Sequence, residues 1–451
     1  MLKKINKIKT KLSEDVHLKE LIQGSLTFFI LRILGMVVGY AFTLIVTRNL
    51  GASAWGIFVL CFTVLHIVSV IGKLGLDTAL LRFIAQYNAQ GKGKTAKYIY
   101  FKSIIIIIPL SLLLSIFLYY LSPLLAEKIF AKKHLAPYLK LMSFALIPFV
   151  LLSINSESLR AFKKIKEYTT LQTFLPFLFA LIFFSISFYI LNIKSIKAVV
   201  VAYILGIGIS FLFSFLLLNK EFSNKNGELE QIPLKQILSI SLPMLLTSSL
   251  FMIMSWTDTI MLGMWRTEEE VGIYNAAVRL SMITSFTLGA INSIAAPKFA
   301  EFWGKGDIKG LAEIAQQSTK LIFWTSAPIL MLYLIFPRWF MGLFGNEFRM
   351  GAISLVFLTI GQFINALTGS VGYILNMTGK SVTVQNVNIG VTVLNLGLNA
   401  LLIPYFGILG AAFASALTIS LGNLANMFFV KKYYNFYTAA GVIGGIKKWI
   451  T

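Results

Sequence analysis

Long apolar runs recur along this 451-residue chain, and they constrain its fold more than any other feature. A helix rises about 1.5 Å per residue, so about 20 apolar residues cross the hydrocarbon core of a membrane. Only 13% of the residues are charged, about half the share found in soluble domains. Runs of spanning length lie at 24–47, 55–72, 103–124, 137–158, 169–191, 198–218, 236–262, 271–296, 319–337, 351–373, 382–404 and 407–430. Since transmembrane strands would be shorter and alternate in polarity, the sequence predicts an all-α integral membrane protein of about 12 transmembrane helices.

The net charge of +22 is tested first against the positive-inside rule. With a cytoplasmic N-terminus, 28 of the 40 Lys and Arg residues fall on the cytoplasmic side, 10 fall outside and 2 lie within spans. The bias predicts a multi-pass protein of the cell membrane with both termini cytoplasmic, and it removes the need for a nucleic-acid partner. One cysteine, Cys61, and three scattered histidines give no disulfide and no metal-ligand spacing, so we expect no metal and no cofactor.

A short internal repeat indicates two lobes. Gly56-Ile57-Phe58 and Gly272-Ile273-Tyr274 each open a span, 216 residues apart, and Arg82-Phe83 matches Lys298-Phe299 at the same offset. Six spans per half in the same orientation predict two parallel six-helix lobes. The predicted divisions are a basic amphipathic segment (1–22), the N-lobe (23–218), a cytoplasmic linker (219–235), the C-lobe (236–430) and a cytoplasmic tail (431–451).

Charged side chains within the spans are the first candidates for function. Arg32 and Arg279 lie near mid-depth in spans 1 and 8. A charge there costs about 2.5–3.5 kcal/mol on insertion scales, so it is expected to face a cavity or a partner. We interpret the pair as an anion site, the alternative being structural ion pairs or bonds to carbonyls. Asp258, an acid well within span 7, is a candidate for a coupling proton or sodium ion, with a wetted helix end or a pairing with Arg279 as alternatives.

Two further patterns have competing explanations. Asn388, Thr392, Asn395 and Asn399 share one polar face of span 11. They either line a hydrophilic cavity, where the three asparagines would bind substrate, or join helices by hydrogen bonds. Glu157 and Arg160, three residues apart at the end of span 4, favour an ordinary i,i+3 surface pair.

Ordered motifs along nearly the whole chain resemble the polysaccharide-transporter family. These are Leu50-Gly51-Ala52-Ser53-Ala54-Trp55-Gly56, Gly75-Leu76-Asp77 with Arg82-Phe83, Asp258-Thr259-Ile260-Met261-Leu262-Gly263, Asn376-Met377-Thr378-Gly379-Lys380, Asn395-Leu396-Gly397-Leu398-Asn399 and Gly407-Ile408-Leu409-Gly410-Ala411-Ala412. The family comprises Wzx-type O-antigen and oligosaccharide flippases of the multidrug/oligosaccharidyl-lipid/polysaccharide (MOP) superfamily. Many of its members have fourteen spans, whereas the apolar runs of this chain predict twelve.

The resemblance implies two six-helix lobes around a central cavity, alternating access and no enzymatic activity. It also implies a flippase for polyprenyl-diphosphate-linked oligosaccharide in cell-surface polysaccharide biosynthesis. Arg32 and Arg279 look like the cavity arginines of lipid II flippases in span and depth. The expected partners are the lipid-linked oligosaccharide, membrane lipids and a coupling H⁺ or Na⁺, and the expected state is a monomer. The alternative is a cation-coupled multidrug antiporter of the same superfamily, which would need acidic cavity residues.

Overall fold

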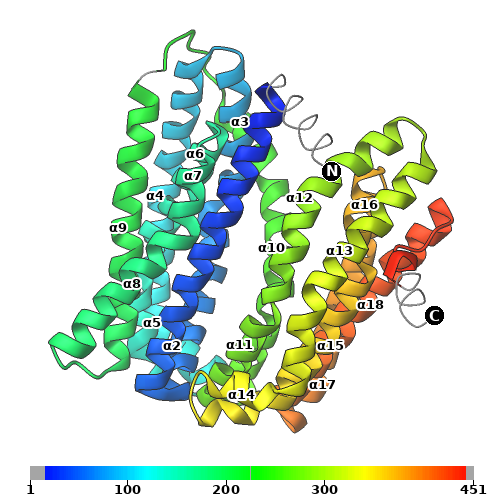
Figure 1. Cartoon of the computed structure of the whole chain (residues 1–451). Coiled ribbons are helices and arrows are strands. Elements are labelled where there is room, and N and C mark those ends of the chain that lie inside the picture. Colours follow the sequence, from blue (N-terminus) through cyan, green and yellow to red (C-terminus); the bar gives the residue numbers. More distant parts are fainter. Residues whose placement is uncertain (1–15, 224, 443–451) are drawn as a thin grey trace. The chain divides into compact units, whose positions relative to one another are not determined.

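A computed structural model describes residues 16–223 and 225–442 of the chain, apart from some side chains (Figure 1). Within these residues every regular element is a helix, and no strand is present. Helices satisfy all of their own backbone hydrogen bonds, which the hydrocarbon core of a membrane requires. The all-α prediction is confirmed. Most of the predicted segment 1–22 and the end of the tail lie outside the described residues.

The described helices fold into two compact units. The first holds the described residues of 1–46 together with 61–252, and the second holds 47–60 together with the described residues from 253 onward. Two helices contribute to both units, namely α2 (Val16–Lys73) and α10 (Leu234–Trp265).

The first unit is built around long apolar helices joined by short ones. Its further elements are α3 (Leu76–Ala89), α4 (Gly93–Leu124), η1 (Leu125–Ile129), η2 (Lys133–Leu135), α5 (Ala136–Ser143), α6 (Leu146–Ala161), α7 (Ile165–Thr169), η3 (Thr170–Phe174), α8 (Leu175–Ser185), η4 (Ile186–Ile190) and α9 (Ile196–Ser223). The segment between predicted spans 2 and 3 is therefore mostly helical, formed by α3 and the start of α4.

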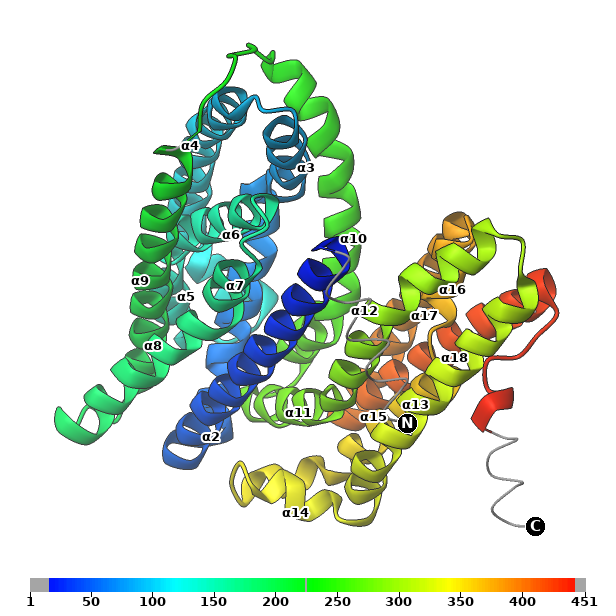
Figure 2. The ribbon, with the colours of Figure 1, turned by 45° about the horizontal axis from the view of Figure 1, so that its top comes forward.

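The second unit has a comparable arrangement. Its elements are α11 (Glu268–Ser281), α12 (Ile283–Gly304), α13 (Ile308–Ile335), α14 (Pro337–Gly342), η5 (Glu347–Gly351), α15 (Ala352–Thr368), α16 (Val371–Met377), α17 (Ser381–Phe406) and α18 (Ile408–Tyr434). The segments Glu268–Asn292 and Ile294–Gly304 meet at a bend of 43°, and this break lies within α12. Figure 2 shows α11 and α12 from a second direction.

By length and composition, eight described helices can cross a membrane, or ten if each of two bent pairs forms one span. One of the eight, Phe29–Lys73, has 45 residues, a rise of about 68 Å and more than twice the thickness of the hydrocarbon core. The protein is thus a multi-pass membrane protein, and the count of twelve spans stays a prediction.

Gly51 breaks α2 and helps to explain why residues 47–60 belong to the second unit. Its φ of 83° lies in the left-handed region, where glycine meets no steric penalty from a β-carbon. The Glu347 carboxylate accepts a hydrogen bond from the backbone N–H of Ala52, and Arg48 donates to the carbonyl of Leu343 over 2.8 Å. An acidic group at the first N–H groups of a helix also complements the helix dipole.

The two glycines that are equivalent in the sequence repeat lie against each other in the second unit. A β-carbon on Gly56 would overlap the Glu268 carbonyl oxygen and lie 3.1 Å from the Gly272 nitrogen. A β-carbon on Gly272 would overlap the Ala52 carbonyl oxygen and lie 3.0 Å from the Gly56 nitrogen. Because neither glycine has a side chain, the backbones of α2 and α11 approach closely at this crossing, as small residues allow in other membrane helix pairs.

We expect Gly56→Ala and Gly272→Ala each to lower the thermal unfolding midpoint of the purified protein. The added carbon meets backbone rather than a flexible side chain, and forced overpacking costs about 1–3 kcal/mol. Gly390→Ala is the matched control, since a β-carbon there has open space, and it should leave the midpoint unchanged or raise it slightly. Equal midpoints for all three variants in a thermal scan would contradict this crossing.

The predicted linker 219–235 is not a free tether in the described part of the chain. The Thr95 hydroxyl accepts from the Glu230 N–H at 2.8 Å, and Lys92 forms an ion pair with Glu230 at 2.9 Å, an interaction that raises the pKa of Lys92. Lys102 donates to the Ile232 carbonyl at 2.8 Å. These contacts fasten the segment to the start of α4, and the boundary between the two units falls farther on, within α10.

The orientation of the chain can be tested at this linker. A cysteine replacing Lys225, in a variant whose Cys61 is serine, should react with a membrane-impermeant maleimide only in broken cells. The reason is the excess of basic residues on that side of the predicted topology. Labelling in intact cells would contradict the predicted cytoplasmic termini, and a cysteine at Lys194, predicted outside, provides the opposite control.

Candidate functional site

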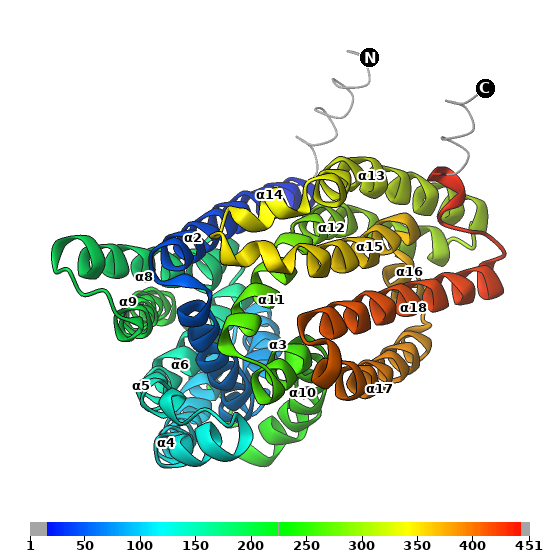
Figure 3. The same cartoon turned by 90° about the horizontal axis from the view of Figure 1, so that it is seen from below.

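Three hydroxyl and amide groups of the second unit hold the carboxylate of Asp258. Tyr274 donates its hydroxyl to Oδ2 over 2.6 Å, and Ser415 donates to the same oxygen. Asn399 donates its amide to Oδ1 over 2.6 Å. Asp258 comes from α10, Tyr274 from α11, Asn399 from α17 and Ser415 from α18, so the site depends on four helices, all of which Figure 3 labels. All of these partners are uncharged.

The hydrogen-bonded cluster continues along α17 toward α18. Asn399 also donates to Oδ1 of Asn395 over 3.0 Å, and Asn395 donates to the Thr418 hydroxyl over 3.3 Å. Asn399 is fully buried, and its Oδ1 has no hydrogen-bond partner among the described residues. A buried acceptor without a donor costs free energy, so it calls for an explanation such as an unseen proton, ion or water.

We call this set of residues the Asp258 cluster, comprising Asp258, Tyr274, Asn395, Asn399, Ser415 and Thr418. It gathers carboxylate, amide and hydroxyl oxygens around one acidic group, and oxygen is the donor that hard cations prefer. The contacts described for Asp258 include no Lys, Arg or His side chain, so a bound proton or a small cation can supply the missing positive charge. Among the described residues, no three His, Cys, Asp or Glu side chains gather as a metal site.

Arg279, on α11, is oriented by two neighbours in the same unit. Its guanidinium lies 5.1 Å from the centre of the Trp55 ring, a cation–π distance. Its Nε donates to Oδ1 of Asn275, one helical turn earlier, over 3.1 Å. Trp55 is fully buried, so its ring forms a fixed platform. The planar fork of Arg279 is thereby held in a set plane, which suits two-pronged donation to an anion.

Arg32 lies on α2 in the first unit, and it is exposed. Gly35, three residues on, is so close to η3 that a β-carbon would lie 2.9 Å from the Thr173 carbonyl oxygen. The same face of α2 brings Arg32 within electrostatic reach of the Tyr168 hydroxyl. Because Arg32 and Arg279 lie in different units, their convergence on one cavity stays a prediction.

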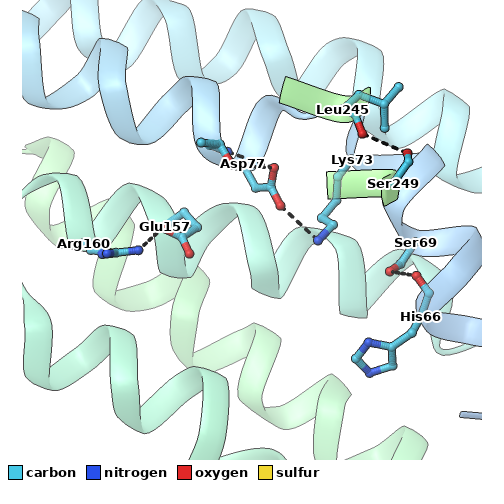
Figure 4. A network of polar contacts seen from close by, with 9 residues as sticks. His66, Ser69, Lys73, Asp77, Glu157, Arg160, Leu245 and Ser249 are labelled. Atoms are coloured by element: carbon cyan, nitrogen blue, oxygen red, sulfur yellow. Dashed lines mark hydrogen bonds and ion pairs between the residues drawn. The ribbon is translucent and has the colours of Figure 1, made fainter. Parts of the chain in front are cut away.

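Figure 4 shows two ion pairs of the first unit. Lys73 pairs with Asp77 at 3.0 Å, and both side chains are mostly buried, at 17% and 14% exposure. The predicted i,i+3 pair of Glu157 and Arg160 is confirmed at 3.4 Å. Glu157 is only 17% exposed, so the pair lies less at the surface than the spacing alone suggested.

The predicted polar face of span 11 divides into two parts. Asn395 and Asn399 join the Asp258 cluster, whereas Asn388 is exposed, and Thr392 bonds to its backbone carbonyl at 2.6 Å. The structure thus brings Asn399 to Asp258, and the binding of sugar by the three asparagines stays a prediction. Sequence reasoning missed Tyr274 and Ser415. The only available signal was that Tyr274 closes the repeated tripeptide Gly272-Ile273-Tyr274.

Comparison with protein families gives two matches. Residues 21–303 match the family described as polysaccharide biosynthesis protein. Residues 243–401 match the MatE family. The first match contains both Arg32 and Arg279, and the second contains Asp258 and Asn399.

Curated relatives include two proteins of Haloferax volcanii. The probable low-salt glycan biosynthesis flippase Agl15 is 28% identical over 183 residues, 40% of this chain and 38% of Agl15. The probable flippase AglR is 25% identical over 38% of this chain and 36% of AglR. The match therefore spans well under half the length of either flippase. An uncharacterized membrane protein of Methanocaldococcus jannaschii is 24% identical over an alignment that covers 84% of this chain and 77% of the relative.

Solved structures with the same fold are membrane transporters. One is a multidrug resistance MATE family transporter of the MOP superfamily in an inward-facing conformation. Its superposition gives a TM-score of 0.75 at 15% identity and covers 90% of this chain and 98% of the transporter. The lipid II flippase MurJ, in an inward closed conformation, has a TM-score of 0.71 and 15% identity, covering 94% and 91%. At this identity the likeness shows the fold, which is that of MOP superfamily transporters.

Proposed function

Because the chain belongs to the polysaccharide biosynthesis protein family, we propose that it is a flippase for polyprenyl-diphosphate-linked oligosaccharide in cell-surface polysaccharide biosynthesis. It would act in the cytoplasmic membrane by alternating access. The observation that carries the proposal is the family match over residues 21–303, which includes both intramembrane arginines. The similarity to Agl15, a probable low-salt glycan biosynthesis flippase, and to AglR, a probable flippase, supports the same kind of transport.

The physical task explains the arginines. A sugar diphosphate must pass about 30 Å of hydrocarbon while its polyprenyl tail remains in lipid. An unpaired diphosphate there is prohibitively costly, so cationic donors must replace its water. Arg279 lies over the Trp55 ring and donates its Nε to Asn275, and its two terminal nitrogens would donate to phosphate oxygens. Arg32 would contribute the second guanidinium from the first unit, and Asn388 would contact sugar hydroxyls.

The Asp258 cluster is assigned to the coupling ion, H⁺ or Na⁺. A carboxylate held by three uncharged donors, beside a buried Asn399 oxygen without a partner, supplies the charge and the oxygen ligands for a cation. This assignment moves Asn395 and Asn399 from sugar binding to the ion site, because both are already engaged within the cluster. We expect the protein to work as a monomer, with membrane lipids as its surroundings.

A second candidate is a cation-coupled multidrug antiporter, which the MatE match over 243–401 favours. The decisive experiment reconstitutes the protein in vesicles and measures both activities. Flipping of a fluorescent polyprenyl-diphosphate oligosaccharide without export of ethidium supports the proposal. Ethidium export driven by a proton or sodium gradient, without flipping, would establish the antiporter instead.

A further inference from the structure

A pocket of about 710 Å³ in the first unit lies between α3, the C-terminal end of α6 and Met244 of α10. Its volume is that of an ordinary small-molecule site. The lining side chains that can donate hydrogen bonds are Arg82, Arg160, Lys163, Asn88 and Thr78. None of the lining residues is acidic, and the remaining ones are apolar. The lining of the pocket therefore combines cationic side chains with apolar ones.

Lys163 occupies a backbone position that normally favours glycine. Its φ is 63°, in the left-handed region. The Lys163 N–H donates to the Arg160 carbonyl at 2.9 Å, and the Lys164 N–H donates to the Leu159 carbonyl at 3.0 Å. These two bonds are the pattern of a Schellman helix end, in which the left-handed residue is usually glycine. The backbone of a lysine is strained in this conformation, where glycine would not be. The presence of a lysine at this position is therefore explained by its side chain, which lines the pocket.

Arg160 is oriented for the same pocket. Its guanidinium lies 5.1 Å from the centre of the Tyr168 ring and 3.4 Å from the Glu157 carboxylate (Figure 4). Glu157 offsets one positive charge, and Arg82, which is exposed, and Lys163 add two more. Tyr168 is also within electrostatic reach of Arg32.

We propose that this pocket docks the diphosphate headgroup of a membrane-embedded lipid before translocation, on the face that the charge pattern predicts to be cytoplasmic. The inference rests on the proposed function and adds a separate loading site to it. Two arginines and a lysine match the several oxygens of a diphosphate, because guanidinium groups donate in pairs and lysine adds a point charge. The apolar lining residues, which include Leu81 and Phe162, suit the parts of such a ligand that carry no charge.

The test measures binding of farnesyl diphosphate, a short polyprenyl diphosphate, to the full-length protein in phosphatidylcholine nanodiscs. We expect saturable binding that inorganic pyrophosphate displaces and that high salt weakens. Arg82→Gln and Lys163→Gly should each lower the affinity at least about tenfold, since each removes a charged donor. Lys97→Gln is the matched control, because it removes one positive charge from an exposed residue of the same unit outside the pocket.

Lys163→Gly separates a binding role from a structural one. Glycine fits the left-handed backbone, so the variant should bind weakly while its thermal midpoint equals or exceeds that of the natural protein. In a flipping assay, Arg82→Gln should raise the half-saturating lipid concentration and leave the maximal rate unchanged. An Arg160 variant would not give a clear result, because the loss of Arg160 would also leave the carboxylate of Glu157 without its ion-pair partner.

Natural affinity in Arg82→Gln and Lys163→Gly, or an equal loss in Lys97→Gln, would overturn the docking site. Displacement of farnesyl diphosphate by phosphatidylglycerol at equal concentration would overturn the assignment to a diphosphate lipid. The binding assay needs no transport, so it decides the docking site even if the protein proves not to flip lipids. Normal flipping by variants that retain full affinity would overturn the docking site and leave the proposed flippase function unaffected.

Discussion

Replacing Arg279 with alanine is expected to slow flipping of a polyprenyl-diphosphate oligosaccharide by about two to three orders of magnitude. Removing one partner of a buried charge pair costs about 3–5 kcal/mol, and about 1.4 kcal/mol corresponds to a factor of ten in rate. Arg32→Ala should have an effect of the same order if the two arginines share the substrate. The measurement is transport by purified variants in vesicles, with the amount of folded protein matched.

Lysine variants sharpen this test. Arg279→Lys should recover part of the activity, because it keeps the charge and loses the planar fork that Trp55 and Asn275 hold in place. Arg338→Ala is the control within the same unit, since Arg338 is exposed and lies outside the candidate sites. Transport at the natural rate by the Arg32→Ala, Arg279→Ala double variant would remove the anion site.

Asp258→Asn is expected to abolish the dependence of flipping on a proton or sodium gradient. Asparagine nearly preserves the shape of the side chain and can still accept from Tyr274 or Asn399, but it carries no charge to hold a cation. We expect the rate under a gradient to fall about tenfold or more, to the rate without one, because a charged hydrogen-bonded group contributes about 1.5–3 kcal/mol. The variant should still purify as a folded protein.

The control for Asp258→Asn is Asn386→Ala, an exposed position on α17 outside the Asp258 cluster. It should keep the full gradient dependence. Asn399→Ala should resemble Asp258→Asn in direction, because Asn399 bonds to the carboxylate and bears the buried oxygen without a partner. Equal gradient responses in Asp258→Asn and the natural protein would end the assignment of this cluster to the coupling ion.

The sequence predicted the helical membrane fold and the candidate charges because both depend on local properties. The length of an apolar run predicts a membrane span. The position of a residue within the run predicts its depth in the membrane, as for Arg32, Arg279 and Asp258. The spacing of Glu157 and Arg160 likewise predicted their contact, since residues three apart share a helix face. The comparisons confirm the superfamily that the ordered motifs indicated.

What the sequence did not reveal depends on contacts between distant segments. Ser415 reaches Asp258 from 157 residues away, and Glu347 reaches the backbone of Ala52 from 295 residues away. The four-residue spacing of Asn395 and Asn399 showed that they share a face, but no local pattern states which helix that face meets. For the same reason residues 47–60 could not be assigned to the second unit from their place in the chain.

The meeting of Gly56 with Gly272 has a consequence for how the two halves of the chain can diverge. A side chain added at one position would collide with main-chain atoms of the other helix. In most packed interfaces a larger residue can be accommodated by a smaller one opposite, but glycine has no side chain left to reduce. No second-site substitution on the facing helix can therefore restore the fit. The glycine of each repeat thus restricts which residues can replace the equivalent glycine of the other repeat.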